Sequence, residues 1–179
     1  MKAIRIHGPK DARYEEVPDP QPGPDDVLIK VKAVAICGTD VELFDGSMFY
    51  ITSGLTKYPF IPGHEWSGEV VEVGENVHGF RPGDAVVGGC SIGCRKCKRC
   101  LSGNYHLCAD RSETGLLKQP GGMAEYISYP QHFLHKVDGL TFEQAAFIEP
   151  TGIAVNPARK TRITPADRVA VFGPGPIGL

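Results

Sequence analysis

Four cysteines lie within fifteen residues of this chain, and their spacing limits its fold more than any other feature of the sequence. The pattern is C-x2-C-x2-C-x7-C, made by Cys94, Cys97, Cys100 and Cys108. Tetrahedral Zn²⁺ takes four thiolates at about 2.3 Å, and CxxC spacing lets one turn supply two of them. Disulfides and reduced surface thiols are the alternatives, but four cysteines packed this closely would form strained bridges. We therefore expect a structural zinc site here.

Four basic residues lie among these cysteines and would offset the net charge of about −2 on a Zn²⁺ ion bound by four thiolates. They are Arg95, Lys96, Lys98 and Arg99. The same residues raise the alternative of a zinc ribbon that binds nucleic acid. No aromatic platform accompanies them, and the formal net charge of the whole chain is −2, so we expect no nucleic-acid partner. The sixth cysteine, Cys90, is expected to be a small packed residue.

The rest of the sequence is mostly typical of a β-rich fold. With 22 Gly and 15 Pro in 179 residues, many turns and short strands are expected. Alternating or short apolar runs predict strands around Ile4 and Ile6 and over residues 27–37, 67–74, 83–89 and 123–130. This spacing predicts a small closed or partly open β-barrel. The first ten residues fit a strand better than a secretory leader, and no apolar stretch has the length of about 18 residues that a membrane span needs.

The pattern changes from β to α/β near residue 141. Thr141 and Gln144 have the spacing of a capping box before an apolar helical run, and Pro150 ends that helix or starts a second one. Residues 167–173, DRVAVFG, are then expected to form a buried parallel strand. We therefore place a mainly β domain at residues 1–150 and the beginning of an α/β domain at residues 151–179.

A glycine turn follows this expected strand. Gly173, Gly175 and Gly178 form a G-x-G-x-x-G pattern. After a strand and near a helix start, such glycines let the backbone approach a pyrophosphate, as in Rossmann dinucleotide-binding domains. Pro174 and Pro176 lack the backbone N–H groups that could donate hydrogen bonds to a phosphate, which is unusual at such a turn. We expect this turn to begin a binding site for NAD or NADP in a longer protein, with the rest of the site missing from this chain, including any residue that would choose between NAD and NADP.

A second group of metal-ligating residue types is spread along the chain. Cys37 lies in CGTD, His64 and Glu65 lie in PGHEWSG, and Glu149 lies in FIEP. Alone, each residue fits a surface position or a hydrogen-bonded polar group of the core. Together they offer a thiolate, an imidazole and carboxylates, which suits a zinc ion with three protein ligands and an open position. An open position favours catalysis, whereas a closed one would make this a non-catalytic module with two structural zincs.

These motifs occur in the order and at the spacing typical of one enzyme family. CGTD, PGHEWSGEVVEVG, RPGDAV, the four cysteines, FIEP and VFGPGPIG together resemble the zinc-dependent medium-chain alcohol dehydrogenases over essentially the whole chain. The resemblance is to the N-terminal catalytic domain, a GroES-like barrel with a zinc-binding lobe, followed by the truncated start of a Rossmann domain. The chain looks like the polyol (sorbitol-like) and threonine dehydrogenases, because the ethanol-oxidising branch has a cysteine ligand in place of Glu149. Lyase and quinone-reductase relatives on this fold usually lack the four-cysteine lobe.

The resemblance implies two zinc ions per chain and a reaction. Cys37, His64 and Glu65 would bind a catalytic zinc, with Glu149 binding directly or through its water, and the four cysteines would bind a structural zinc. A secondary alcohol of polyol or hydroxy-amino-acid type would pass hydride to NAD or NADP. Thr39 matches the hydroxyl that takes the substrate proton, since a hydroxyl donates and accepts at once.

One position departs from the family pattern. Many relatives have a histidine five residues after the cysteine ligand, where this chain has Glu42. A carboxylate could pass a proton onward with a different pH dependence, whereas a solvated helix residue would take no part. Residues 45–59 lie between the ligands in sequence and are a candidate for part of the substrate wall.

The remaining expectations concern the whole protein. The chain resembles a truncated piece of a longer cytoplasmic dehydrogenase, whose complete form would be a homodimer or homotetramer with a small alcohol or polyol as its substrate. The 179-residue chain alone is expected to be inactive, because it cannot place a nicotinamide beside the reacting carbon. No membrane partner is expected.

Overall fold

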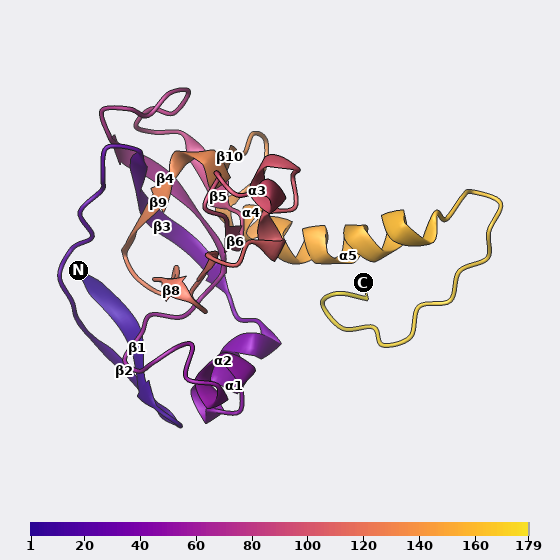
Figure 1. The fold of residues 1–179 in the computed structure, drawn as a ribbon, viewed down its shortest axis with the longest axis horizontal. Helices are drawn as coiled ribbons and strands as arrows, with labels where there is room; N and C mark the ends of the chain where they lie inside the picture. The colour runs from indigo at the N-terminus through magenta and orange to yellow at the C-terminus, as the bar shows by residue number, and fades with distance from the viewer. Residues whose placement is uncertain (179) are drawn as a thin grey trace.

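The computed structural model describes residues 1–178, and a five-stranded antiparallel sheet forms its body (Figure 1). The strands lie in the order β10-β5-β4-β3-β9, and every neighbouring pair is antiparallel. Their bounds are β3 (Asp26–Ala35), β4 (Glu65–Val73), β5 (Ala85–Gly88), β9 (Tyr126–Pro130) and β10 (Leu134–Lys136). The strands expected over residues 27–37, 67–74, 83–89 and 123–130 are thus present, and the mainly β prediction is confirmed.

The main core lies on the inward face of this sheet. Alternation along β3 buries Val27 and Ile29, and these pack with the aromatic pair Trp66 and Tyr129, whose ring centroids are 5.2 Å apart. The aromatic pair needs a glycine on the neighbouring strand, because a Cβ at Gly88 would lie 2.5 Å from the Trp66 ring. This core is the rigid base from which the functional segments project.

An N-terminal hairpin packs beside the sheet. It consists of β1 (Lys2–Gly8) and β2 (Asp11–Glu16), and isolated bridges from Ala3 to Ala124 and from Ile6 to Phe60 join it to the body. Ile6 is buried as expected, whereas Ile4 is partly exposed. Two helices, α1 (Gly38–Asp45) and α2 (Phe49–Thr52), follow β3. We call residues 47–58, which contain α2, the wall loop.

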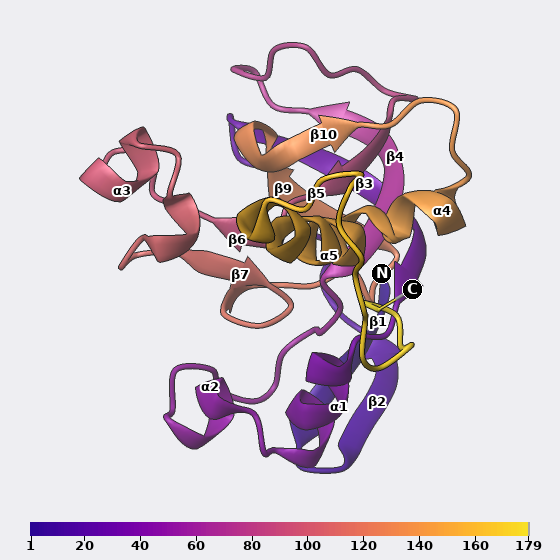
Figure 2. The ribbon, with the colours of Figure 1, turned by 90° about the vertical axis from the view of Figure 1, so that its right-hand side faces the viewer.

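The four cysteines lie in a lobe that stands out from the sheet on the same side as α2 (Figure 2). We call residues 91–119 the cysteine lobe. A small sheet in the order β6-β7-β8 supports it. Its elements are β6 (Ser91–Ile92), α3 (Lys98–Leu101), the 3-10 helix η1 (Tyr105–Leu107), β7 (Ser112–Thr114) and β8 (Lys118–Gln119).

Two helices close the sheet at one end and lead away from it. After the 3-10 helix η2 (Gln131–Phe133) and β10, helix α4 (Phe142–Ala146) packs on β3 and β4, and α5 (Ile148–Thr161) extends outward (Figure 1). The expected capping box is present, with Thr141 and Gln144 bonded reciprocally. Pro150 lies in the first turn of α5, where its missing N–H is tolerated, so it belongs to the second helix.

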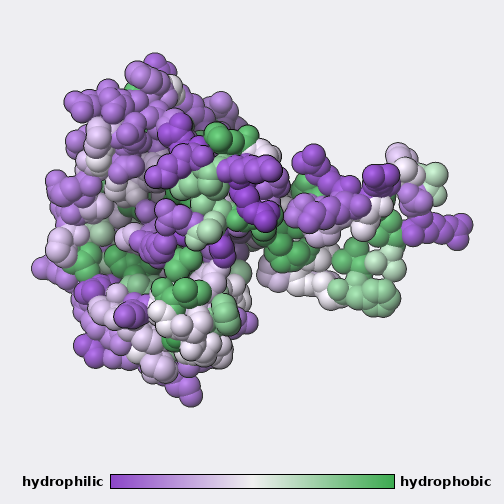
Figure 3. Space-filling view, viewed as in Figure 1, coloured by the Kyte–Doolittle hydropathy of each residue, from purple (hydrophilic) through white to green (hydrophobic). Residues whose placement is uncertain are grey.

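The prediction of a buried parallel strand over residues 167–173 is wrong for this structure. Residues 167–172 form no strand, and Phe172 is 94% exposed. A parallel strand is stabilised by neighbouring strands and by helices on both faces, and no such partners flank this segment in the part of the chain described. Apolar side chains therefore stay exposed along α5 and the segment after it (Figure 3). No helix among the described residues has both the length and the apolar character needed to cross a membrane.

Candidate metal centres

Three candidate ligands meet at one end of the sheet. Ala35 at the end of β3 pairs with Glu65 at the start of β4, so Cys37 just after one strand faces His64 just before the other. The ligand atoms of Cys37, His64 and Glu65 all lie within 4.8 Å of one another. His64 and Glu65 are buried, and Cys37 is half-buried. We call these three residues the Cys37 group.

Asp40, which the sequence analysis did not single out, fixes two members of this group. Cys37 caps α1, and Asp40 closes the capping box by accepting the Cys37 N–H at 2.9 Å. Its second oxygen accepts the Gly63 N–H at 3.3 Å and lies 3.8 Å from His64 Nδ1, an atom that is buried with no hydrogen-bond partner in the described residues. The local sequence gives little signal for this role, because a capping box is usually formed by Ser or Thr with Glu or Gln, whereas Cys37 and Asp40 form it here.

The charge balance of the Cys37 group fits a bound cation. The Glu65 carboxylate is buried, and no lysine or arginine within residues 1–178 pairs with it. Burial raises the pKa of the Cys37 thiol, and Glu65 adds to this rise, while hydrogen bonds from Thr39 oppose it. Buried anions require a compensating charge, and a thiolate, an imidazole and a carboxylate together are a donor set that Zn²⁺ accepts.

Glu149 lies near the Cys37 group, but it is not among the residues whose ligand atoms all lie within 4.8 Å of one another. It occupies the first turn of α5 and is half-buried. Burial raises the pKa of its carboxyl, His64 lowers it, and Glu65 raises it further, so both residues lie within electrostatic reach of Glu149. This position fits a ligand that approaches a metal directly or through water.

The two proposed proton-transfer residues lie in different surroundings. Thr39 is half-buried, and its Oγ1 lies 3.8 Å from Cys37 Sγ. Glu42 is exposed on α1, and its backbone carbonyl accepts the N–H groups of Gly46 and Met48. The structure therefore brings Thr39 to the Cys37 group, while the Glu42 side chain is in solvent. The role of each residue stays a prediction.

The four cysteines of the lobe have the geometry of a metal cage. Their Sγ atoms lie 3.9 Å apart for Cys94 and Cys100, 3.5 Å for Cys97 and Cys100, and 3.8 Å for Cys97 and Cys108. A tetrahedron of thiolates about 2.3 Å from zinc has edges of about 3.8 Å, whereas a disulfide bond measures about 2.05 Å. All six cysteines of the chain are free.

The backbone of the lobe favours thiolate at one of these positions. N–H groups of Lys96 and Cys97 lower the pKa of the Cys94 thiol to about 6. Burial, and then hydrogen bonding to Cys97, raise the pKa of Cys100 to about 12. A bound metal cation would favour thiolate at all four positions, because metal ligands must be deprotonated.

The predicted phosphate-binding glycines form a turn at the far end of the described chain. Gly173 has φ of +89°, and the Gly178 N–H donates to the Gly175 carbonyl at 2.9 Å. A Cβ at Gly178 would lie 2.0 Å from the Gly173 carbonyl oxygen, so this turn requires glycine. Its cofactor role remains a prediction.

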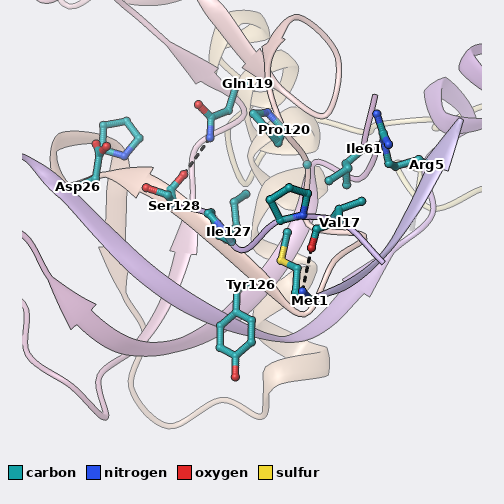
Figure 4. A pocket seen from close by; sticks show the side chains of 14 residues that line it. Met1, Arg5, Val17, Asp26, Ile61, Gln119, Pro120, Tyr126, Ile127 and Ser128 are labelled. Carbon is teal, nitrogen blue, oxygen red and sulfur yellow. Dashed lines mark hydrogen bonds between the residues drawn. The ribbon is translucent and has the colours of Figure 1, made fainter. Parts of the chain in front are cut away.

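A cavity of about 520 Å³ opens elsewhere, between the N-terminal hairpin and β9 (Figure 4). Met1, Arg5, Gln119 and Tyr126 are among the residues that line it. No member of the Cys37 group and no cysteine of the lobe lines this cavity, so it is separate from both candidate metal centres.

Comparison with known proteins agrees with the arrangement of these groups. The family model described as the alcohol dehydrogenase GroES-like domain matches residues 23–139. The sorbitol dehydrogenase of Bacillus subtilis (strain 168) is 36% identical over 180 residues, covering 100% of this chain and 50% of the relative. The chain thus spans about half the length of the curated relatives it matches.

Solved structures give the same result. The 2R,3R-butanediol dehydrogenase of Bacillus subtilis superposes with a TM-score of 0.87 at 37% identity, covering 99% of this chain and 52% of that one. A structure described as a short chain alcohol dehydrogenase from Escherichia coli CFT073, complexed with NADH, superposes with a TM-score of 0.88 at 33% identity, covering 99% of this chain and 50% of that one. The chain therefore belongs to the zinc-dependent medium-chain alcohol dehydrogenase family and corresponds to its N-terminal, GroES-like domain.

Proposed function

We propose that this chain is the metal-binding catalytic half of a dehydrogenase that oxidises a secondary alcohol with NAD or NADP. The alcohol is of the polyol or hydroxy-amino-acid class. The observation that carries the proposal is the Cys37 group, in which three ligand types lie within 4.8 Å of one another at an end of the sheet. A sorbitol dehydrogenase and a butanediol dehydrogenase among the relatives support the substrate class.

Cys37, His64 and Glu65 are the proposed ligands of a catalytic zinc, with Glu149 as a fourth group that binds directly or through water. A zinc ion in such a site acts as a Lewis acid that makes a bound hydroxyl group more acidic. Asp40 accepts hydrogen bonds from the backbone N–H groups of Cys37 and Gly63, the residue before His64, and its carboxylate faces the His64 ring at 3.8 Å, which supports the relative placement of two ligands. Four cysteines of the lobe are the proposed ligands of a second, structural zinc.

Thr39 is the proposed first acceptor of the substrate proton. Its hydroxyl lies beside the Cys37 thiol, so it is close to where a bound alcohol would sit. A hydroxyl can accept that proton while donating its own to the next group. Glu42 is the proposed next group, and its exposure gives it direct exchange with solvent.

The nicotinamide cofactor is proposed from the family and the glycine turn. One solved relative is complexed with NADH. Gly173, Gly175 and Gly178 are the proposed backbone contacts to its pyrophosphate, since their pattern is that of a dinucleotide-binding turn.

The test is an assay of the complete product of the gene that encodes this chain, with NAD⁺ and NADP⁺ against sorbitol, butanediol and threonine. We expect reduced nucleotide to form with at least one alcohol. Changing Cys37 to Ser or His64 to Ala should abolish turnover, while Cys90→Ser, outside both metal groups, should retain it. Turnover that survives His64→Ala would overturn the assignment of the Cys37 group.

A further inference from the structure

Three side chains join the wall loop to the cysteine lobe in a closed ring of hydrogen bonds. The Tyr50 hydroxyl donates to Glu113 Oε2 at 2.9 Å. Arg111 donates from Nη2 to the Tyr50 hydroxyl at 3.0 Å and from Nε to Glu113 Oε1 at 2.5 Å. All three side chains are half-buried. We call this ring the Tyr50 latch.

Arg111 also contacts a cysteine of the lobe. The Cys108 carbonyl accepts the Arg111 N–H at 3.4 Å and Nη1 at 3.5 Å. Cys108 is 1% exposed, and its Sγ lies 3.8 Å from that of Cys97. A metal held by the four thiolates would therefore fix the turn of residues 108–111 and, with it, the direction of the arginine side chain.

The latch lies at the same end of the sheet as the Cys37 group. β5 runs antiparallel to β4 and ends beside the start of β4, where Glu65 lies. Cys90 follows β5, its carbonyl accepts the Thr114 N–H at 3.0 Å, and Ser91 pairs with Glu113. Glu113 of the latch therefore pairs with the segment that continues from β5 beyond the start of β4.

Cys90 supplies independent support for this placement. Its side chain packs in the same apolar cluster as Tyr50. Burial raises the pKa of its thiol, and Glu149, Glu113 and Cys37 raise it further. The half-buried Cys90 side chain thus packs near Tyr50 of the latch and is within electrostatic reach of Cys37.

Apart from the latch, apolar packing of Met48, Tyr50 and Ile51 against a buried cluster that includes Leu43 and Leu116 holds the wall loop, and polar side-chain contacts near α2 are few. Helix α2 has four residues, too few to be stable without outside contacts, and Phe49 is 68% exposed. The Thr56 hydroxyl donates to the Leu116 carbonyl at 2.5 Å, which ties down the far end of the loop. Near α2, Tyr50 makes the polar side-chain bonds to the lobe among the residues described.

We propose that Arg111 is a positioning residue, which orders the wall loop through Tyr50 and Glu113 only while a thiophilic cation holds Cys108 in the lobe. The second metal then does more than stabilise the lobe, because it sets a segment beside the Cys37 group. That this segment borders the substrate rests on the proposed function, whereas the coupling between lobe and loop does not.

Hydrogen exchange measured by mass spectrometry on this chain tests the coupling without nucleotide or alcohol. The zinc-loaded chain is compared with the Cys108→Ser and Cys37→Ser variants, which each remove one proposed site. We expect Cys108→Ser to speed exchange of residues 48–54 roughly tenfold, the effect of losing about one charge-assisted hydrogen bond. Cys37→Ser and the strand peptide of residues 27–35 should show no such rise. Unchanged exchange in residues 48–54 of Cys108→Ser would overturn the proposal.

Tyr50→Phe separates the latch from a general loosening of the lobe, because it removes only a hydroxyl and keeps the ring. In this variant, residues 48–54 should exchange fast even with zinc bound, and removal of zinc by a chelator should change them no further. Tyr14→Phe, at an exposed tyrosine on β2, is the matched control and should behave as wild type. If residues 48–54 of Tyr50→Phe still exchange slowly and only with zinc bound, the latch is not the element that couples the lobe to the loop. This result would overturn the proposal even if Cys108→Ser fails to fold.

Discussion

Asp40 is a single buried carboxylate that serves two candidate ligands of one metal. It accepts the Cys37 N–H and lies 3.8 Å from the otherwise unpartnered Nδ1 of His64. An Asn at this position can still accept the backbone N–H but carries no charge for the imidazole. We therefore expect Asp40→Asn to weaken metal binding at the Cys37 group by about 10–100-fold, as is typical for partners of a metal-bound histidine.

Cobalt titration of the chain with its cysteine lobe already filled by zinc measures this affinity. Asp45→Asn is the matched control, since Asp45 lies on the same helix, is exposed, and accepts the Ser47 N–H instead. Equal cobalt affinity in Asp40→Asn and wild type would show that Asp40 only caps the helix.

Thr39 gives the second prediction at this scale. In the complete gene product, Thr39→Val should lower turnover by about 10²–10⁴-fold, the usual contribution of general acid–base catalysis, while Thr39→Ser keeps most of it. If Glu42 passes the proton on, Glu42→Gln should slow turnover and shift its pH profile, and Glu42→His should restore the rate. Normal turnover in a zinc-replete Thr39→Val enzyme would exclude the relay.

The candidate metal ligands could largely be predicted from the sequence, whereas the residues that hold these ligands and the wall loop in place could not. Spacing alone predicted the grouping of the four cysteines, because a CxxC turn limits where two thiols can point. The grouping of Cys37 with His64 and Glu65 was first suggested by their metal-ligating residue types and was strengthened by the family resemblance, because the local sequence does not show that β3 pairs with β4. Asp40 and the Tyr50 latch went unpredicted, since an Asp, a Tyr, an Arg and a Glu signal little until the fold places them.

At the scale of elements, the turn between β4 and β5 depends on Asp84. Its carboxylate accepts the Arg81 N–H at 2.9 Å and pairs with Lys136 on β10 at 2.7 Å, so it joins the turn to the edge strand. The hydrogen bond from Lys136 holds the pKa of Asp84 below its usual value. A depressed pKa stabilises the fold above the unfolded value, and the contribution disappears as the pH falls through the folded value.

We therefore expect Asp84→Asn to lower the free energy of unfolding by about 1 kcal/mol at pH 7. The difference from wild type should shrink progressively as the pH falls below about 4, the usual pKa of an aspartate in the unfolded chain, toward the lower pKa of the folded protein. Urea denaturation at a series of pH values measures both. Asp11→Asn, which breaks an exposed pair with Arg13, should have no measurable effect. A deficit in Asp84→Asn that persists unchanged at pH 3 would contradict the ionic origin.

Elements could be predicted where local sequence decides them. The capping box at Thr141 and Gln144 is local, and the helix begins there as expected. Residues 167–172 were assigned wrongly because a parallel strand depends on neighbours that the local pattern does not supply. The short helix α2 and the wall loop carry no periodic pattern, so packing against Leu43 and Leu116 determines them.

For the whole molecule, the two candidate metal centres differ in how they are joined to the core: the Cys37 group lies at the ends of two strands of the main sheet, whereas the four cysteines lie in the cysteine lobe. The main apolar core lies in the five-stranded sheet and includes only Ile92 from the cysteine lobe. The lobe has small strands and a four-residue helix of its own, so a metal is the main source of order that its sequence offers. The sheet should consequently stay folded when the lobe loses its metal.

This difference predicts the order in which metals leave. We expect native mass spectrometry to detect two Zn²⁺ ions per chain, with a chelator removing the ion of the Cys37 group first. Four thiolates at tetrahedral spacing enclose an ion on all sides, whereas three mixed ligands leave one side open to the chelator. Changing Cys94, Cys97, Cys100 and Cys108 together to Ser should remove the slowly lost ion and leave the β-sheet circular dichroism largely intact. A tightly held ion that persists in this fourfold variant would place the stronger site at the Cys37 group, and the lobe would then depend on protein contacts alone.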